Sequence, residues 1–388
     1  MREQSVVDLL RREGPMSRAT IARRCGVSKP TASHVVEILL RAELVIERGH
    51  DVAGNGRPGR LVAFNGDAGY VVGMDVGGTT TRAVLANLEG TVVRTIREPT
   101  ESESPARLVA QIARIVDALA DGATPDGATP DGATADAAAT ANRVLEVAIG
   151  TPGVVDRTNR RISIAPNLPA LESEGFLDRL EEAVARPLSV MNDVNAATLG
   201  ELRDGAGATV TDLAYVSIGT GLGFGLAIAR EIHHGVGGRA GELGLLAYPP
   251  GGATSLEDHL SGAGVRRRHT RAGGSGNPED AFLEAEEGRE PGASVIAAFM
   301  SDLNWALTLV ATLIDPDRIV LGGGIGLRCA PHLDTIRASV ARSTGYPVDV
   351  AVAELGDDAG LMGAVASALE PARSVERLLG GGQMASIR

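Results

Sequence analysis

The chain has 388 residues, a net charge of −12 and a hydrophobic content of 44%. That is enough apolar material for two or three folded domains, and it excludes a disordered protein. Its two cysteines, Cys25 and Cys329, lie far apart and exclude a disulfide scaffold. We find no apolar run that approaches the roughly 20 residues of a membrane helix, and the charged N-terminus is unlike a signal peptide. We therefore expect a soluble, cytoplasmic protein with no membrane partner.

The charge is divided unevenly along the chain. Residues 1–66 hold 11 Lys and Arg against 7 Asp and Glu, whereas the remainder holds 26 against 42. A basic segment joined to an acidic body indicates that only the N-terminal part contacts nucleic acid.

The N-terminal segment predicts three helices followed by a β-hairpin. Apolar periodicity predicts helices at residues 4–13 and 29–41 with a shorter helix between them, and Ser17 and Ser28 are N-cap candidates. Two alternating stretches within residues 44–65 then predict a hairpin with a long basic tip. This order of elements is typical of a winged helix-turn-helix.

We expect the helix at residues 29–41, the second of the helix-turn-helix pair, to lie in the major groove of DNA. Its N-terminal side chains would then be nearest the bases. Arginines at the wing tip suit a narrow minor groove, where negative potential is concentrated. The alternative is a small helical module that binds protein, but the turn spacing, the basic wing and the local charge together favour DNA. The candidate DNA-binding residues are Lys29, Thr31, Ser33, His34, Arg57 and Arg60.

From Tyr70 the pattern becomes that of an α/β protein. Residues 70–100 predict paired strands with a glycine-rich turn, and residues 105–120 predict an amphipathic helix. A pentapeptide repeat at residues 121–135 has too little apolar content to pack, so we expect a mobile surface insertion there. Strand-like and helix-like segments alternate from there to about residue 370.

Three glycine-rich turns each follow an apolar strand. Backbone N–H groups in such turns can approach phosphate oxygens, and a carboxylate beside them can hold a phosphate-bound Mg²⁺ through its waters. One such turn is also typical of a plain hairpin, but three of them favour a nucleotide held between two lobes. The turn residues are Asp75, Gly77, Gly78 and Thr79, then Gly219, Thr220 and Gly221, and finally Gly323 and Gly324.

Asp193 follows a strand-like segment and precedes a helix. A carboxylate there could accept a proton from a substrate hydroxyl that attacks a γ-phosphate. It could equally be the N-cap of the helix, a role that Asp and Asn fill routinely. The spacing alone leaves both roles open.

Further motifs occur along the chain in the order GTPGVVD, APNLP, NDVNAATLGE, SIGTGLGFG, GRAGELG and VLGGGIG. Together with DVGGTT and the N-terminal segment, they make the chain resemble the ROK family of repressors and sugar kinases, within the actin-like superfamily. The resemblance implies an α/β fold: an N-terminal winged helix-turn-helix followed by a two-lobed, actin-like (ribonuclease H-like) sugar-kinase/ATPase body. Ligands are then expected between the lobes.

The resemblance also implies a division into domains. We expect a DNA-binding domain at residues 1–68, a small lobe at 69–190 and a large lobe at 191–358. A C-terminal helix at about 359–375 would complete the small lobe, and a low-complexity insertion at 121–141 would interrupt it.

Roles for single residues follow from the same resemblance. The first two glycine turns, with Asp75, would face the phosphates, Gly323 and Gly324 would lie near adenosine, and Asp193 matches the catalytic base. A ring of carboxylates and amides suits sugar hydroxyls, because each hydroxyl is both donor and acceptor. The positions that match the family's sugar-binding residues are Asn167, Asn192, Asp193, Glu242 and Glu257.

The chain departs from the family at its structural zinc site. Leu245 stands where the resemblance predicts a histidine ligand, and Tyr248, Pro250 and Ser255 stand where it predicts cysteines. A closed zinc site needs thiolate or imidazole ligands, so we expect neither zinc nor another metal there. We expect the loop to be held instead by packing of Leu245, Leu246 and Tyr248. The choice of sugar could differ as well, because the missing histidine normally lies beside the sugar.

We therefore predict a sugar-responsive DNA-binding transcriptional regulator, a repressor of carbohydrate uptake or catabolism genes. A sugar or sugar phosphate bound between the lobes would release or re-orient it. The expected partners are double-stranded operator DNA, that effector, and further copies of the chain in a homodimer or homotetramer. The alternative is an ATP-dependent hexose kinase, or a bifunctional kinase and regulator, with Asp193 as general base. Mg-ATP is the cofactor in that case, and no cofactor is expected otherwise.

Overall fold

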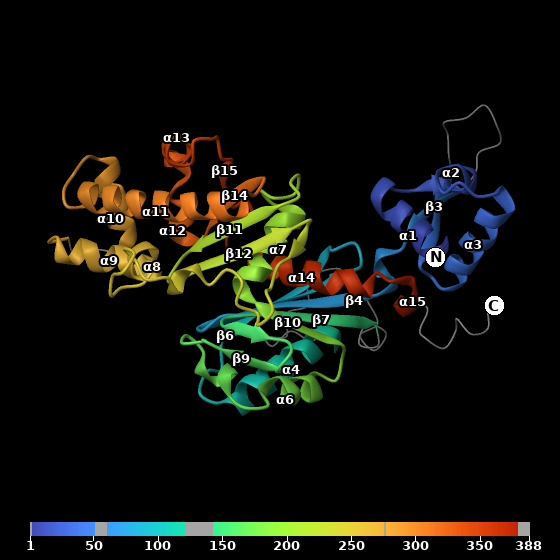
Figure 1. Cartoon of the computed structure of the whole chain (residues 1–388). Coiled ribbons are helices and arrows are strands. Elements are labelled where there is room, and N and C mark those ends of the chain that lie inside the picture. The colour runs from blue at the N-terminus through green and yellow to red at the C-terminus, as the bar shows by residue number, and fades with distance from the viewer. Residues whose placement is uncertain (1, 51–59, 122–142, 275–276, 379–388) are drawn as a thin grey trace.

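The computed structural model describes residues 2–50, 60–121, 143–274 and 277–378. Figure 1 shows a small N-terminal head beside a body of two α/β lobes. Helix α14 lies between the two lobes, and its C-terminal end points toward the head. The expected wing tip with Arg57, the pentapeptide repeat and the end of the chain lie outside the described residues.

The head is a winged helix-turn-helix, as predicted. Its three-stranded sheet has the order β1-β3-β2. The Ser17 hydroxyl accepts from the Thr20 N–H, and the Ser28 hydroxyl accepts from the Thr31 N–H at 3.2 Å, so both expected N-caps are confirmed. Its elements are α1 (Arg2–Glu13), β1 (Met16–Ser17), α2 (Arg18–Arg24), α3 (Lys29–Arg41), β2 (Val45–His50) and β3 (Arg60–Phe64).

The first lobe is a five-stranded sheet with helices on both faces. The strand order is β10-β7-β4-β5-β6, and β4, β7 and β10 run parallel. One face packs against α4 and α6, whose apolar side chains join the core of the sheet, and the other face lies against α14 and α7. The strands are β4 (Tyr70–Val76), β5 (Thr80–Asn87), β6 (Val92–Pro99), β7 (Val144–Thr151) and β10 (Leu188–Asn192). The helices are α4 (Pro105–Asp121), α6 (Phe176–Val184), α7 (Asp193–Asp204) and α14 (Ala359–Ala372). Smaller elements are η1 (Gly66–Ala68), β8 (Val154–Asp156), β9 (Arg161–Ser163) and η2 (Pro169–Glu172).

The second lobe contains another five-stranded sheet, with the order β13-β12-β11-β14-β15. Its strands are β11 (Leu213–Ile218), β12 (Leu222–Ile228), β13 (Glu231–Ile232), β14 (Arg318–Gly322) and β15 (Val350–Val352). Its helices are α8 (Leu256–Leu260), α9 (Gly262–Arg271), α10 (Pro278–Glu286), α11 (Gly292–Ile314), α12 (Gly323–Leu327) and α13 (Leu333–Thr344). Short turns at η3 (Leu243–Leu245), η4 (Ala330–His332) and η5 (Gly356–Asp358) join them, and α15 (Val375–Leu378) follows α14.

Two details refine the expected segments. Residue 190, the expected lobe boundary, falls inside β10, which pairs with β7 along its whole length. We propose that the first lobe extends through β10 and includes α14. Strand β14 ends at Gly322, so the third glycine turn opens directly into the short helix α12.

Helix α11 is, by length and composition alone, apolar enough to cross a membrane. Its side chains Phe299, Leu303 and Leu307 are buried in the core of the second lobe. The apolar composition of α11 is therefore explained by its packing inside this lobe.

Helices α14 and α7 approach each other so closely that two glycines are required. A Cβ added at Gly363 would lie 1.7 Å from the Ala196 carbonyl oxygen, and one added at Gly200 would lie 2.3 Å from the Ala359 carbonyl oxygen. Neither neighbour is a flexible side chain, so the two helices would have to separate to accept any larger residue.

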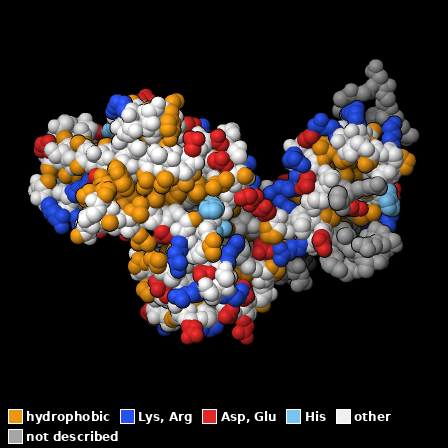
Figure 2. Space-filling model, in the orientation of Figure 1, with side chains coloured by type: hydrophobic (Ala, Val, Ile, Leu, Met, Phe, Trp, Pro, Cys, Tyr) orange, Lys and Arg blue, Asp and Glu red, His pale blue; other side chains and the backbone are white. Residues whose placement is uncertain are grey.

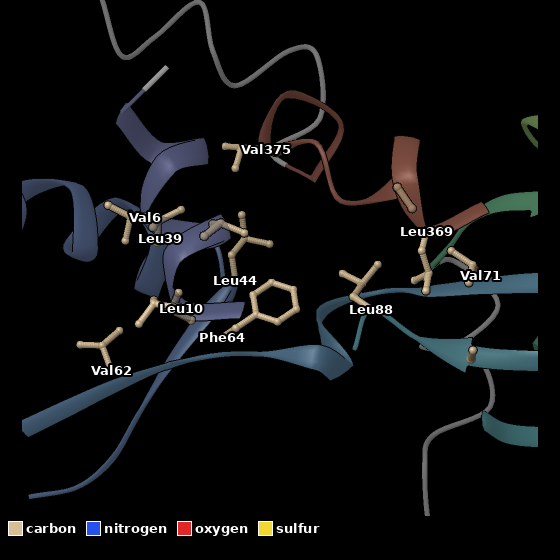
Figure 3. Packing of buried hydrophobic residues seen from close by; sticks show 14 of the residues in the cluster. Val6, Leu10, Leu39, Leu44, Val62, Phe64, Val71, Leu88, Leu369 and Val375 are labelled. Atoms are coloured by element: carbon tan, nitrogen blue, oxygen red, sulfur yellow. The ribbon is translucent and has the colours of Figure 1, made fainter. Parts of the chain in front are cut away.

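The head and the body share one apolar cluster. Figure 3 shows Phe64 of the head and Leu88 of the body lying between the head core and Leu369 of α14. Just beyond the end of α14, the side-chain amide of Gln4 donates to the Arg373 backbone carbonyl at 3.3 Å. The Val375 N–H donates to the side-chain oxygen of Gln4 at 2.7 Å. The head therefore packs against the end of α14 through apolar side chains and through two hydrogen bonds of Gln4.

The glycine contact between α14 and α7 gives a stability prediction. We expect Gly363→Ala to lower the free energy of unfolding by about 3 kcal/mol or more, because the added methyl group collides with backbone. Gly360→Ala in the same helix is the matched control, since the nearest atom to its added Cβ is 3.8 Å away. Equal unfolding midpoints in urea for the two variants would contradict the close packing.

Candidate functional site

The carboxyl ends of the parallel strands place the predicted site residues at the edges of two sheets. Asp75 lies near the end of β4, and Asn192 and Asp193 lie at the end of β10 in the same sheet. Gly219 and Gly323 follow β11 and β14, which are parallel neighbours in the second sheet. Asp75 is close enough to influence the titration of Asp193. Such edges are where open α/β sheets bind ligands.

Asn192, rather than Asp193, caps helix α7. Its side-chain oxygen accepts from the N–H groups of Val194 at 2.9 Å and Asn195 at 3.1 Å, and its amide donates to the Gly153 carbonyl at 3.1 Å. Of the two roles that the sequence left open for Asp193, the capping role belongs to its neighbour. Asp193 is the first residue of the helix and accepts from the Val194 N–H at 2.8 Å.

Asp193 is a carboxylate with a perturbed titration. Burial raises the pKa of Asp193 to about 6, and the nearby Asp75 contributes in the same direction. Burial also raises the pKa of Glu242, with further contributions from Asp193 and Glu257. These carboxylates therefore lie close enough to influence one another, and Asp193 is a stronger base than an ordinary aspartate.

The remaining sugar-binding candidates lie beside the glycine turns. Glu257, in the first turn of α8, accepts from the Leu222 N–H at 3.0 Å, and a Cβ at Gly221 would come within 2.9 Å of the same carboxylate oxygen. A Cβ at Gly78 would lie 2.6 Å from the Asn167 carbonyl oxygen, so this glycine lets the exposed Asn167 approach the first turn. The structure thus groups Asn192, Asp193, Glu242 and Glu257, and holds Asn167 against the first turn.

Backbone hydrogen bonds and close contacts hold the three glycine turns in place. In the first, the Gly77 N–H donates to the Thr80 carbonyl at 3.0 Å and closes the hairpin between β4 and β5. In the second, the Gly219 N–H donates to the Gly221 carbonyl at 3.0 Å. Gly323 has φ +75°, and a Cβ there would lie 2.6 Å from the Ile218 carbonyl oxygen, so the last two turns lie side by side. Thr79 and Thr220 lie in the first and second turns, and Gly324 lies in α12.

The loop at the expected zinc positions is built differently from our expectation. Leu245 and Leu246 are 60% and 40% exposed, so the prediction that they pack to hold the loop is wrong. A backbone hydrogen bond helps to hold the loop instead, in which the Leu256 N–H donates to the Leu246 carbonyl at 2.8 Å. Ser255 caps α8 with a capping box, and Pro250 lies exposed on the loop.

Tyr248 anchors this loop, as predicted, but through polar contacts as well as packing. Its hydroxyl donates to Asp302 on α11 at 2.8 Å, and its ring lies 4.8 Å from that of Trp305. Arg268 of α9 pairs with the same Asp302 carboxylate, and its guanidinium lies 2.6 Å from His259 Nδ1. The network joins the loop to α9 and α11 and so holds the segment that carries Glu242 and Glu257.

The candidate DNA-binding residues that the structure describes lie near the start of α3 and at the start of β3. Lys29 and His34 are exposed, and Thr31 and Ser33 are partly exposed on the same helix. Arg60 is exposed and pairs with Glu47 across the hairpin. DNA would have to compete with Glu47 for Arg60.

Sequence reasoning missed three residues that connect this site. Arg82 pairs with Asp75 at 2.7 Å, and the strand register around the first glycine turn could have revealed it, because the two residues lie directly opposite each other. Asp302 and Gln4 act through contacts with residues far away in the sequence, so no local signal marks them.

These features define a class of protein: two facing α/β lobes with carboxylates and glycine turns between them, preceded by a DNA-binding head. Comparison with known proteins gives the family. A model of the ROK family matches residues 132–370, and a helix-turn-helix domain model matches residues 4–48. The chain belongs to the ROK family.

Relatives of two kinds are similar to this chain. A glucokinase of Streptomyces coelicolor is 29% identical over 78% of this chain and 98% of that protein. A xylose repressor of Bacillus spizizenii is 30% identical over 60% of this chain and 56% of that protein.

Two solved structures are similar as well. A ROK family glucokinase from Streptomyces griseus, in complex with glucose and AMPPNP, aligns with 77% of this chain and 99% of that chain at 27% identity and a TM-score of 0.61. A ROK family transcriptional regulator, a homolog of the E. coli MLC protein, shares the fold over 97% of this chain and 98% of that chain, with a TM-score of 0.75 at 20% identity.

The raised pKa of Asp193 gives a prediction about stability. Because its folded-state pKa of about 6 lies above the ordinary 3.8, ionisation of Asp193 opposes folding as the pH rises through 6. Asp193→Asn should therefore raise the melting temperature at pH 8, and the gain should disappear toward pH 4.

For a control variant, Asp317→Asn, the expected change in stability has the opposite sign. Asp317 accepts from the N–H groups of Thr211 and Asp212, and these hydrogen bonds hold the pKa of Asp317 below its usual range. Asp317→Asn should destabilise the fold at pH 8 and have less effect in acid. Thermal unfolding at both pH values measures both variants. A pH-independent gain for Asp193→Asn would contradict the assignment.

Proposed function

We propose that this chain is a sugar-responsive transcriptional regulator that represses genes of carbohydrate uptake or catabolism and is released by a sugar or sugar phosphate bound between its lobes. The observation that carries the proposal is that helix α14 touches both sites. Its first turn lies beside the cleft, where a Cβ at Gly360 would be 3.8 Å from the Asp75 carboxylate. Just beyond its last turn, Arg373 and Val375 hold the head through hydrogen bonds with Gln4.

The roles of single residues follow the grouping in the cleft and on the head. Asn167, Asn192, Asp193, Glu242 and Glu257 bind sugar hydroxyls, and the glycine turns face the phosphate side. Lys29, Thr31, Ser33, His34, Arg57 and Arg60 contact DNA, with the start of α3 in the major groove. Sugar binding changes the angle between the lobes, and α14 carries the change to the head.

The junction between head and body leaves room for such a movement. A cavity of about 770 Å³ lies beside the Gln4 contact, lined on the head side by Asp8 and Arg11 and on the body side by Arg203 and Arg373. The cavity supports a movement of the head about its contact with the end of α14.

A regulator of this kind acts as a homodimer or homotetramer on paired half-sites. Half-sites on one face of DNA are about 34 Å apart, so a modest rotation of two heads breaks their register. Figure 2 shows hydrophobic side chains gathered in a band across the second lobe. Exposed leucines on elements of this lobe are Leu245, Leu246, Leu283 and Leu313. Such a surface supports self-association.

The Gln4 contact gives the test of this proposal. Operator fragments are first selected from genomic DNA, and their affinity is then measured with and without D-xylose, D-glucose and their phosphates. We expect Gln4→Ala to keep the wild-type sugar affinity, because Gln4 is remote from the cleft, but to lose most of the sugar-dependent change in DNA affinity. Arg12→Ala on the same helix is the control, since the exposed Arg12 donates to the Asp8 carbonyl within α1 and has no hydrogen bond to the body among the described residues. A full sugar response in Gln4→Ala would contradict the route through α14.

One observation favours a second function, an ATP-dependent hexose kinase, alone or combined with regulation. Asp193 has the raised pKa of a general base and could accept the proton of a sugar hydroxyl. A hexose panel with Mg-ATP tests this alternative. Sugar-dependent ADP release that disappears in Asp193→Ala would establish the kinase, and a silent panel would exclude it.

A further inference from the structure

Arg82 binds Asp75, the carboxylate expected to face the phosphates. It is on β5 directly opposite Asp75 on β4. Its Nη2 is 2.7 Å from Asp75 Oδ2, and both side chains are 21% exposed. An arginine is always protonated and loses little freedom on forming such a pair, so Asp75 is held by a permanent positive charge.

The same guanidinium also bridges the two lobes. Its Nη1 is 3.0 Å from Asp358 Oδ1, and its Nη2 donates to the Asp357 carbonyl. Both aspartates belong to η5, the turn that follows β15 of the second sheet and leads directly into α14. Arg82 thus joins the first sheet, the second lobe and the start of the helix that holds the head.

These residues do not fit a magnesium nucleotide, the cofactor that the family's kinases imply. A hydrated Mg²⁺ is held through carboxylate oxygens, and Arg82 already occupies Oδ2 of Asp75 and leaves only Oδ1, beside its own guanidinium. Placing a divalent cation there would bring it against the guanidinium charge. Moving Arg82 away would leave a partly buried positive charge unpaired and would break the link to Asp358.

We propose that Arg82 is the resident cation of the cleft: it occupies Asp75 and Asp358 in place of a metal-bound nucleotide, so that the sugar binds alone. The inference rests on the proposed regulatory function and names its ligand class, a sugar without a metal-nucleotide partner. Arg82 is then the specificity-determining residue on the phosphate side, and its bridge to η5 sets the ligand-free position of α14.

The test measures divalent-cation binding directly, with Mn²⁺ as the probe, followed by electron paramagnetic resonance, and with Mg-AMPPNP by calorimetry. We expect wild type to bind Mn²⁺ no better than Asp75→Asn does. Arg82→Ala should bind Mn²⁺ about tenfold more tightly than wild type or better, because it unmasks the carboxylate. The double variant Arg82→Ala/Asp75→Asn should lose this gain. Arg97→Ala is the matched control, since Arg97 is exposed on β6 next to Arg82 in register.

Two outcomes would overturn the inference. One is a wild-type chain that binds Mg-AMPPNP as tightly as Arg82→Ala does, and the other is an Arg82→Ala variant that gains no cation site. Asp358→Asn, which keeps the Asp75 pair and removes only the bridge, should leave Mn²⁺ binding weak even if Arg82→Ala fails to fold. Operator and sugar binding, measured on the same preparations without metal, show separately whether the regulatory function holds.

Discussion

The contact between α14 and α7 is the constraint on which the rest of the structure depends. Gly363 and Gly200 allow the two backbones to touch, and no side chain larger than a hydrogen atom fits at either position. Because α7 begins at Asp193 and α14 begins beside Asp75, this contact fixes the two aspartates relative to each other. Since α14 also ends at the head, the same contact links the two aspartates to the position of the head.

Electrostatic repulsion inside the cleft is the second feature of the account. Burial raises the pKa values of Asp193 and Glu242, and the neighbouring carboxylates Asp75 and Glu257 add to the shifts. A cluster of this kind costs stability in the empty protein and favours a ligand with many hydroxyl donors. Arg82 offsets part of the repulsion from within the chain. A neutral, hydroxyl-rich ligand adds no further negative charge beside these carboxylates.

The sequence was informative where structure is local. The caps at Ser17 and Ser28, the amphipathic helix α4 and the glycine turns all follow from spacing over a few residues, and the structure has them where we expected them. The sequence failed where contacts are remote. Gln4 reaches Arg373 across 369 positions, and Tyr248 reaches Asp302 on another helix. Leu245 and Leu246 were expected to pack, yet their loop is held by backbone pairing and by Tyr248, so these apolar residues are left exposed.

The proposed regulator couples the sugar site to the head through α14. The most direct measurement is the affinity for the effector sugar, determined by calorimetry with and without saturating operator DNA. Linkage requires that DNA weakens sugar binding by the same factor by which sugar weakens DNA binding, and we predict a factor of about ten or more. Equal sugar affinity in the two conditions would contradict the coupling, and with it the account of this protein as a sugar-responsive regulator.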